Sequence, residues 1–409
     1  MNLYRVFIVS ALLGTYFIEL ISQWLNLKSM RVDLPLEFTG LYDDEKYRKS
    51  QKYTRAGTMF HLVESSTGLI CLFVFWFAGG FYFLDEFVRS FHWNSIFTGL
   101  LYIGILAFAS SLLGLPFSIY STFVIEERFA FNRTTPLTFV MDRLKAMLLT
   151  IVLGGPLLGL VLWFFGFLGS NAWFFCWLVC CVAILVIQFV APIWLFPLFN
   201  KYTPLPDGEL KDAIRDYAGR IGFSFRDILI MDGSRRSSKA NAFFTGFGKY
   251  KRIALFDTLV EQHTVPELVA VLAHEIGHYK KKHVFRMILL SFFHLALLLF
   301  LLSLFIHSRQ LAEAFFLKEI SIYTGIVFFG LVYEPVSFLW SILINVLSRR
   351  DEFEADRFAR ETIEDPELMV RSLEKLSVRN LANLTPHSFH VFLHYSHPPL
   401  RERIEAIRG

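Results

Sequence analysis

Two histidines four residues apart, with a glutamate directly after the first, form the segment of this chain best suited to chemistry. They are His274, Glu275 and His278, in the run His-Glu-Ile-Gly-His. In an α-helix, residues four apart lie within about 40° of each other, so both imidazoles would project from one face. Two imidazoles placed in this way can bind one tetrahedral Zn²⁺, and Glu275 can reach a water on the same metal. We therefore predict one Zn²⁺ per chain, with the two histidines as ligands and Glu275 as the general base.

A third ligand is needed, because a catalytic zinc normally has three protein ligands and one open position. The candidates lie in an acidic cluster that follows the last apolar run. Glu352 shares a helical face with two small residues, Ala355 and Ala359, which would let this helix pack closely on the histidine helix. Glu354 shares its face with charged residues, which predicts a solvated surface. We therefore predict Glu352 as the third ligand. Asp356, one turn further on, is expected to accept the free N–H of a ligating histidine.

The composition places these residues in a membrane protein. Of the 409 residues, 54% are hydrophobic, 17% aromatic and 19% charged. A soluble protein is about 45–50% apolar and about 25% charged. Several apolar runs are long enough to cross about 30 Å of hydrocarbon. These features exclude a purely soluble enzyme, a disordered scaffold and a disulfide-stapled secreted domain. The net charge of +4 is too small to indicate a nucleic-acid partner, and we expect none.

Seven membrane spans position the polar segments. We predict them at 3–25, 62–84, 96–120, 146–168, 172–196, 284–307 and 321–346. Pro335, near the middle of the seventh, is expected to break that helix. Lys and Arg are abundant in the loops 26–61 and 121–145 and scarce in the loops between them. The positive-inside rule therefore places these two loops, and the polar segment after the fifth span, in the cytoplasm.

The polar segments predict a small catalytic region. A helical pattern at 209–221 precedes strand-like runs at 227–231, 240–245 and 252–256, which predict a small antiparallel sheet. The fold class is thus mainly α: a seven-helix integral membrane protein with a small α+β, zincin-like cytoplasmic region. We divide the chain into five membrane helices (1–196), an α+β catalytic segment ending in the metal helix (197–283), two further membrane helices (284–346) and a helical C-terminal segment with the third ligand (347–409).

Further short motifs follow the histidine motif and the acidic cluster in a recognisable order. The cluster reads Ser-Arg-Arg-x-Glu-Phe-x-Ala-Asp, and the other motifs lie at 124–132, 199–206, 241–243, 255–259 and 394–400. Together they resemble the type I CAAX prenyl protease family, multi-pass zinc metalloproteases of the gluzincin kind. The resemblance implies seven membrane helices around a large chamber, with the zinc at its cytoplasmic end. It also implies proteolysis next to a C-terminal lipidated cysteine.

The resemblance supports the three metal ligands and the base, and it implies two further roles. Asn241 corresponds to the family's contact with the substrate backbone, and His397 to a late histidine near the scissile carbonyl. An Asn in a short strand can bond to an extended peptide, although a turn or capping role is also open. His397 precedes a proline, which favours extended backbone, so it can either stabilise an oxyanion or serve in packing. Lys239 and Ala240 stand where several family members have His-Ser.

The predicted function is that of a membrane-embedded zinc endopeptidase, including release of the C-terminal tripeptide of prenylated proteins. Its expected partners are peptide or protein substrates, among them chains prenylated at a C-terminal cysteine, and membrane lipid. A general quality-control metalloprotease is one alternative, which shares the chemistry and differs in substrate. A transport or scaffold protein with a structural zinc is another, but such a site normally has four protein ligands and no free carboxylate like Glu275.

The short loop between the last two spans resembles bacterial members of the family. We therefore expect a bacterial cell membrane, or the endoplasmic reticulum membrane if the source is eukaryotic, with the catalytic site facing the cytoplasm.

Overall fold

A computed structural model describes residues 2–31, 33–35, 38–40, 43–245 and 251–409. Within this part of the chain, seven continuous helical segments are long and apolar enough to cross a membrane. They are α1 (Leu3–Ser29), α2 (Asp44–Phe77), α4 (Ser95–Tyr120) with the π-helical turn Ser121–Glu126, α5 and α6 (Pro136–Leu149 and Gly155–Phe167), α7 (Ala172–Val190), α12 (His283–Phe305) and α14 (Ile322–Thr362). The prediction of a mainly α fold with seven membrane helices is confirmed.

The helices extend well beyond the apolar runs, so the predicted loop boundaries are wrong. Residues 44–61 of the predicted loop 26–61 belong to α2, and the predicted loop 121–145 contains the end of one helix and the first turns of α5. Local capping explains the difference. The Asp43 carboxylate accepts the Lys46 N–H at 2.6 Å, and Thr135 caps α5 with a proline at its first position. Such caps start a helix in polar sequence, where hydropathy gives no signal.

Helix α14 continues through Pro335, so the predicted break there is also wrong. A proline is tolerated inside membrane helices because neighbouring groups satisfy the freed carbonyl. The helix has 41 residues and is therefore about 60 Å long, twice the thickness of the hydrocarbon core. Its last turns lie outside the apolar part and carry Glu352 and Asp356. The seventh span and the acidic cluster are therefore one rigid element.

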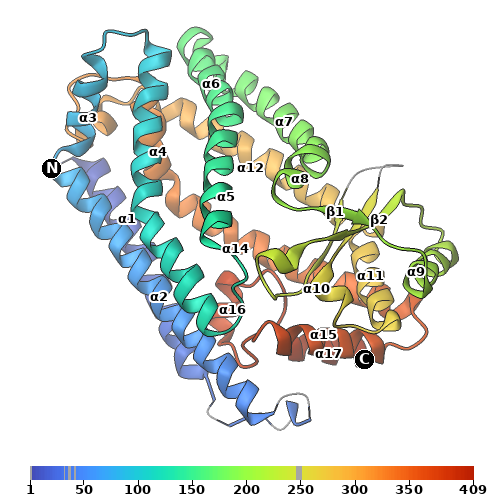
Figure 1. Ribbon diagram of the computed structural model, residues 1–409. Helices are drawn as coiled ribbons and strands as arrows, with labels where there is room; N and C mark the ends of the chain where they lie inside the picture. Colours follow the sequence, from blue (N-terminus) through green and yellow to red (C-terminus); the bar gives the residue numbers. More distant parts are fainter. Residues whose placement is uncertain (1, 32, 36–37, 41–42, 246–250) are drawn as a thin grey trace.

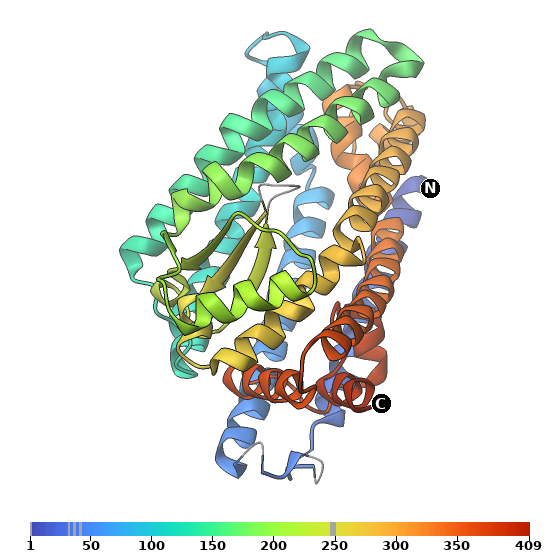
Figure 2. The ribbon, with the colours of Figure 1, turned by 90° about the vertical axis from the view of Figure 1, so that its right-hand side faces the viewer.

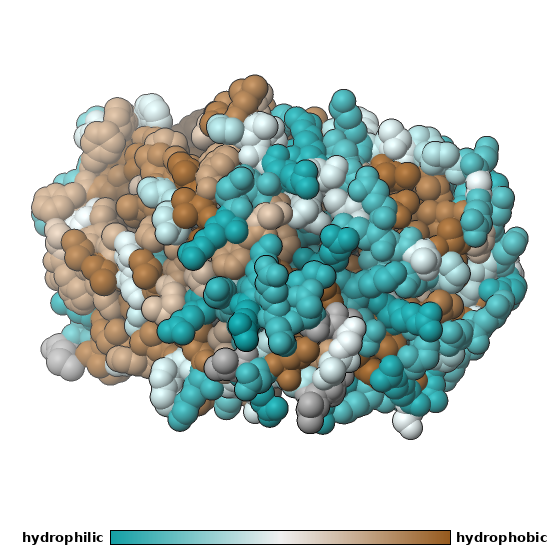
Figure 3. Space-filling model, turned by 60° about the horizontal axis from the view of Figure 1, so that its bottom comes forward, coloured by the Kyte–Doolittle hydropathy of each residue, from teal (hydrophilic) through white to brown (hydrophobic). Residues whose placement is uncertain are grey.

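Among the membrane helices, α14 packs against α1, α4, α6 and α12. Helices α1 and α2 lie side by side at one edge, and α6 and α7 pair at another (Figures 1 and 2). At one end the short helices α3 (Gly80–Arg89) and α13 (Arg309–Ala314) close an aromatic cluster, in which the rings of Phe315 and Phe328 stack at 3.8 Å. Many large apolar side chains of the spans remain exposed, as expected of a lipid-facing surface. Figure 3 shows hydrophobic side chains gathered on one side and hydrophilic ones on the other.

The small sheet has four strands in the order β1-β2-β4-β3. They are β1 (Tyr202–Pro204), β2 (Asp227–Met231), β3 (Ala242–Thr245) and β4 (Arg252–Phe256). The outer pairs are antiparallel, but β2 and β4 are parallel, so the predicted all-antiparallel sheet is wrong at its centre. The apolar pattern of a strand defines its faces and not its direction. Here β3 and β4 form a hairpin whose second strand lies beside β2, which makes β3 an edge strand.

Helices cover this sheet and connect it to the membrane part. Helix α9 (Glu209–Arg220) and helix α11 (Val265–Lys280) pack around a shared core with β2 and β4, while α10 (Asp257–Val260) follows β4 directly. The C-terminal helices are α15 (Glu367–Arg379), α16 (Ser388–His394) and α17 (Leu400–Arg408). His390 and His394 hold α16 against α1 through Ser22 and Glu19, at 2.9 and 3.0 Å. Helices α16 and α17 also pack on α14, whereas α15 packs on α11 and α17.

Candidate functional site

Helix α11 carries the histidine motif and has a well-defined start. The Glu267 carboxylate accepts the Thr264 N–H at 2.8 Å and pairs with Lys375 at 2.7 Å. These contacts cap the helix and attach it to α15. Its apolar face packs on the sheet, with Leu268 and Leu272 about 1% exposed. Contacts with α15 at its start and with the sheet along its apolar face therefore hold the helix that carries the histidine motif in place.

Helix α11 packs closely on α14 at Gly277. A Cβ added there would lie 3.1 Å from both the Cα and the carbonyl oxygen of Ala355, so only glycine allows this contact without a shift. Ala355 and Ala359 are completely buried, as the small-residue pattern predicts. The close contact brings the acidic cluster of α14 against the histidines of α11.

Three side chains converge within the distances that one metal ion requires. The Nε2 atoms of His274 and His278 are 3.1 Å apart. Glu352 places Oε2 at 3.4 Å from the first Nε2 and Oε1 at 3.3 Å from the second. Ligands about 2.0–2.1 Å from a tetrahedral zinc are separated by about 3.3–3.4 Å. Glu352 is only 3% exposed, so its carboxylate is buried against the two imidazoles. These donors therefore fit a single bound cation.

The surroundings of His274 favour positive charge. Burial alone would lower the pKa of its imidazole, but hydrogen bonds with Asp356 and Glu352 outweigh burial and raise that pKa to about 9. The Asp356 Oδ1 atom lies 2.8 Å from Nδ1, the ring nitrogen that faces away from His278. A carboxylate in this position fixes the ring orientation and leaves Nε2 free for a metal.

Arg403, on α17, is a further residue of this site that the sequence analysis missed. It donates to both oxygens of Asp356, at 2.6 and 2.8 Å, and lies 3.4 Å from Glu352 Oε2. Burial opposes its charge, but the hydrogen bond and charge of Asp356 raise the pKa of the guanidinium above its ordinary value. The sequence does contain one indication of this role. Arg403 lies on the same face of α17 as the buried residues Ile404 and Ile407, where a charged side chain is unusual.

Glu275 lies beside the cluster with its carboxylate unengaged. It is half-buried, and it forms no hydrogen bond or ion pair with any residue that the structure describes. Burial raises the pKa of this carboxyl above its ordinary value and Glu352 adds to the rise, while His274 and His278 oppose it. A carboxylate with a raised pKa and no fixed partner is suited to accept a proton.

His397 and Asn241, the two residues that the resemblance adds to the site, lie in different places. His397 joins the cluster, with Nδ1 at 3.0 Å from Glu352 Oε2 and its side chain 65% exposed. Asn241 lies just before β3, is exposed, and accepts the Ala242 N–H with its own Oδ1 at 2.8 Å. The structure thus brings His397 together with the metal-binding candidates and places Asn241 at the edge of the sheet.

Lys239 connects the segment before β3 to the membrane part. Its Nζ is 3.0 Å from Glu126 and 2.8 Å from the Tyr53 hydroxyl, and it lies 4.5 Å from the centre of the Phe131 ring. These partners belong to α2 and to the segment after α4. The segment that carries Asn241 and leads into the edge strand β3 is therefore attached to the membrane part.

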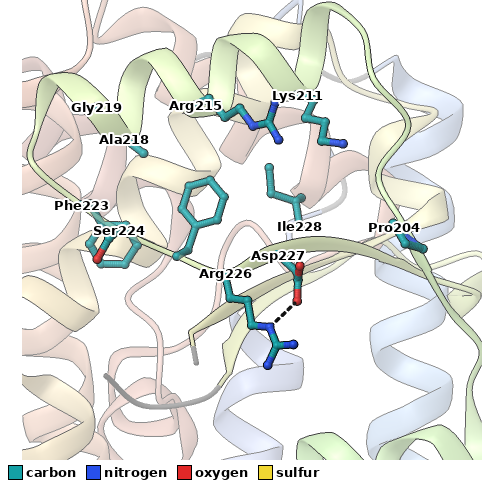
Figure 4. Close-up of a pocket in the computed structure, with 11 residues that line it drawn as sticks. Pro204, Lys211, Arg215, Ala218, Gly219, Phe223, Ser224, Arg226, Asp227 and Ile228 are labelled. Atoms are coloured by element: carbon teal, nitrogen blue, oxygen red, sulfur yellow. Dashed lines mark ion pairs between the residues drawn. The ribbon is translucent and has the colours of Figure 1, made fainter. Parts of the chain in front are cut away.

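A separate pocket of about 390 Å³ lies between α9 and β2 (Figure 4). Its basic residues have acidic neighbours: Lys211 pairs with Asp207 at 2.7 Å, and Arg226 with Asp227 at 3.5 Å. None of the candidate metal or catalytic residues lines it. The pocket is therefore distinct from the metal cluster.

Comparisons with known proteins agree with this geometry. Residues 23–201 match the family model described as the CAAX prenyl protease N-terminal region with five membrane helices, and residues 204–409 match peptidase family M48. The chain is 33% identical to CAAX prenyl protease 1 of Saccharomyces cerevisiae, covering 93% of this chain and 89% of the relative. It is 31% identical to the human CAAX prenyl protease 1 homolog, covering 92% and 88%.

A solved structure extends the likeness to the whole fold. The crystal structure of S. mikatae Ste24p superimposes with a TM-score of 0.95, at 31% identity and over 100% of both chains. Sequence and fold thus agree over the membrane part and the catalytic part. This chain belongs to the CAAX prenyl protease family, the membrane-embedded metalloproteases of peptidase family M48.

Proposed function

We propose that this chain is a zinc endopeptidase that cleaves proteins next to a prenylated C-terminal cysteine. The observation that carries the proposal is the convergence of His274, His278 and Glu352 within 3.4 Å, with the unengaged Glu275 beside them. Two imidazoles and a carboxylate are the donors that catalytic zinc sites of this type use. The relatives carry the name CAAX prenyl protease, which supports the choice of substrate.

The residues have distinct roles in this proposal. His274, His278 and Glu352 hold one zinc per chain, which when bound lowers the pKa of a water toward 7 and polarises the scissile carbonyl. Glu275 takes the proton of the attacking water and returns it to the leaving amine. Asp356 accepts the Nδ1–H of His274 and keeps its Nε2 directed at the metal.

Two residues serve the substrate. Strand β3 lies at the edge of the sheet, which supports pairing with an extended peptide, and Asn241 just before it can bond to the peptide backbone. His397 is exposed next to the ligand cluster, where its ring N–H can donate to the oxygen that gains charge during attack.

The position of the metal helix supports a substrate held at the membrane. His278 lies five residues before His283, the first residue of the membrane helix α12. The Nδ1 atoms of His278 and His283 are 2.9 Å apart, so the proposed zinc would lie close to the start of that helix. Exposed apolar side chains begin immediately, with Val284 46% and Phe285 60% exposed. The basic residues of the segments at 26–61 and 121–145 support a cytoplasmic location for this end.

A prenyl group should therefore increase the rate of cleavage. Burying its apolar surface contributes about 25 cal/mol per Å², or several kcal/mol for a chain of fifteen carbons. We expect kcat/KM for an S-farnesylated C-a-a-X peptide to exceed that of the same peptide with a carboxamidomethylated cysteine by at least about 10-fold. The assay compares both peptides with the purified protein in one detergent, with mass spectrometry of the cleavage site.

A third peptide, polar and without a C-a-a-X ending, completes this comparison. Equal kcat/KM for the farnesylated and the carboxamidomethylated peptide would refute the lipid preference. Efficient cleavage of the polar peptide as well would favour a general membrane quality-control protease. Either result would leave the metallopeptidase chemistry in place.

A further inference from the structure

His283 lies behind the proposed metal ligand His278, on the side away from the metal. It is 3% exposed, and its ring centre is 5.0 Å from that of His278. The Nδ1 atoms of the two rings are 2.9 Å apart. A turn at Lys282, with φ at +60°, separates α11 from α12 and brings His283 back onto the preceding helix. The first residue of a membrane helix thus contacts a metal-binding candidate.

Glu354 completes a chain of contacts through His283. Its Oε2 atom is 3.1 Å from His283 Nε2, and its Oε1 atom accepts from Arg350 at 3.2 Å. Glu354 thus has the charged neighbour Arg350 that its helical face predicts, but its side chain is only 29% exposed because His283 also contacts it. The pattern of residues along α14 could not predict this contact, because His283 belongs to a different helix, α12.

The hydrogen atoms of this chain follow from the role of His278. Its Nε2 faces His274 and Glu352, so this nitrogen must present a lone pair to a metal, and its Nδ1 must carry the hydrogen. His283 Nδ1 is then the acceptor, and its Nε2–H donates to the Glu354 carboxylate. The carboxylate thus selects the tautomer of His283, and His283 in turn selects that of His278.

The same residues could be read as a second metal site, because His283, Asp351 and Glu354 have donor atoms within 4.8 Å of one another. Two contacts argue against it. Asp351 is paired with the guanidinium of Arg286, a cation already at this position. Both ring nitrogens of His283 are also engaged, one with His278 and one with Glu354. The hydrogen-bonded chain therefore accounts for His283 and Glu354, and the ion pair with Arg286 accounts for Asp351.

We propose that His283 and Glu354 are positioning residues, which act in series to hold His278 in its metal-binding tautomer and orientation. The proposal rests on the proposed role of His278 as a zinc ligand. Asp356 serves His274 directly, whereas Glu354 serves His278 through a second imidazole. Since His283 begins α12 and Glu354 lies on α14, the chain also ties the metal geometry to two membrane helices. Loss of such outer partners typically weakens metal binding about 10–100-fold.

The test measures zinc affinity by competition with a chromophoric chelator. We expect His283→Ala and Glu354→Ala each to weaken zinc binding by about 10-fold or more. The matched control is Glu361→Ala, an exposed carboxylate on the same helix, which should bind zinc like the wild type. Thermal unfolding of the metal-free variants separates a change in affinity from a loss of folding. The absorption bands of the cobalt-substituted proteins report the altered ligand geometry.

The double variant tests whether the two residues act in series. Adding Glu354→Ala to His283→Ala should change the affinity by less than about twofold, because the first loss already disconnects the carboxylate. Unchanged affinity in Glu354→Ala, or two losses that add in the double variant, would overturn the proposal. If His283→Ala does not fold, Glu354→Ala against Glu361→Ala still decides it. Failure of the proposed function itself would appear separately, as a wild-type protein that binds no zinc.

Discussion

Glu275→Gln is expected to lower kcat for peptide hydrolysis by about 10²–10⁴-fold while the protein keeps its zinc. Such a loss corresponds to about 3–5 kcal/mol of activation free energy. The reason is that Glu275 touches none of the metal-binding donors in the structure, and its carboxylate is unengaged beside them. The amide has nearly the same size but cannot accept the proton of the attacking water.

Single-turnover hydrolysis of a farnesylated peptide and metal analysis of the same preparation measure both parts of this expectation. Glu261→Gln, an exposed carboxylate that precedes α11, is the matched control and should retain full activity. A Glu275→Gln protein with most of the wild-type kcat would remove Glu275 from the role of base. Loss of zinc from the Glu275→Gln protein would instead show that Glu275 contributes to metal binding.

Glu352→Ala is expected to abolish stable zinc binding and, with it, all hydrolysis. Glu352 is 3% exposed and is the only carboxylate of the described residues that lies within 3.4 Å of the Nε2 atoms of both histidines. Its removal leaves two imidazoles, which cannot hold the ion against dilution or a weak chelator. Zinc per chain, measured after gel filtration, should fall from one to a trace.

The structure changes the control for this experiment. Glu354 is the obvious neighbour to compare, but its contact with His283 makes it unsuitable. Glu361 is a better control, because it is exposed and lies about two and a half turns beyond Glu352 on α14. A Glu352→Ala protein that still carries one zinc per chain would show that another carboxylate completes the site.

Helical spacing was sufficient to predict which side chains meet. His274 and His278 share a face because they are four residues apart, and Glu352 shares a face with the two alanines that contact α11. Both arguments depend on periodicity within a single helix, which the sequence specifies directly. For the same reason the seven apolar helices could be predicted, although their polar turns could not.

The remaining parts of the site depend on tertiary contacts between distant segments. Arg403 reaches Asp356 from a helix 47 residues further along the chain, and His283 reaches Glu354 over 71 residues. A single sequence can show that a charged residue lies on an apolar helical face, but it does not show which distant residue will pair with it. The parallel pairing of β2 with β4 has the same origin, because strand direction is decided by the path of the hairpin and not by the strand residues.

Zinc removal and return is the measurement that tests the central claim most directly. The purified protein is treated with a chelator, and hydrolysis of the farnesylated peptide is followed as zinc is added back, with metal content determined at each point. We expect activity to disappear with the metal and to return in full at one zinc per chain, but not in the His274→Ala, His278→Ala double variant. Undiminished hydrolysis by protein shown to contain no metal, or recovery in the double variant at the same zinc content, would contradict the account.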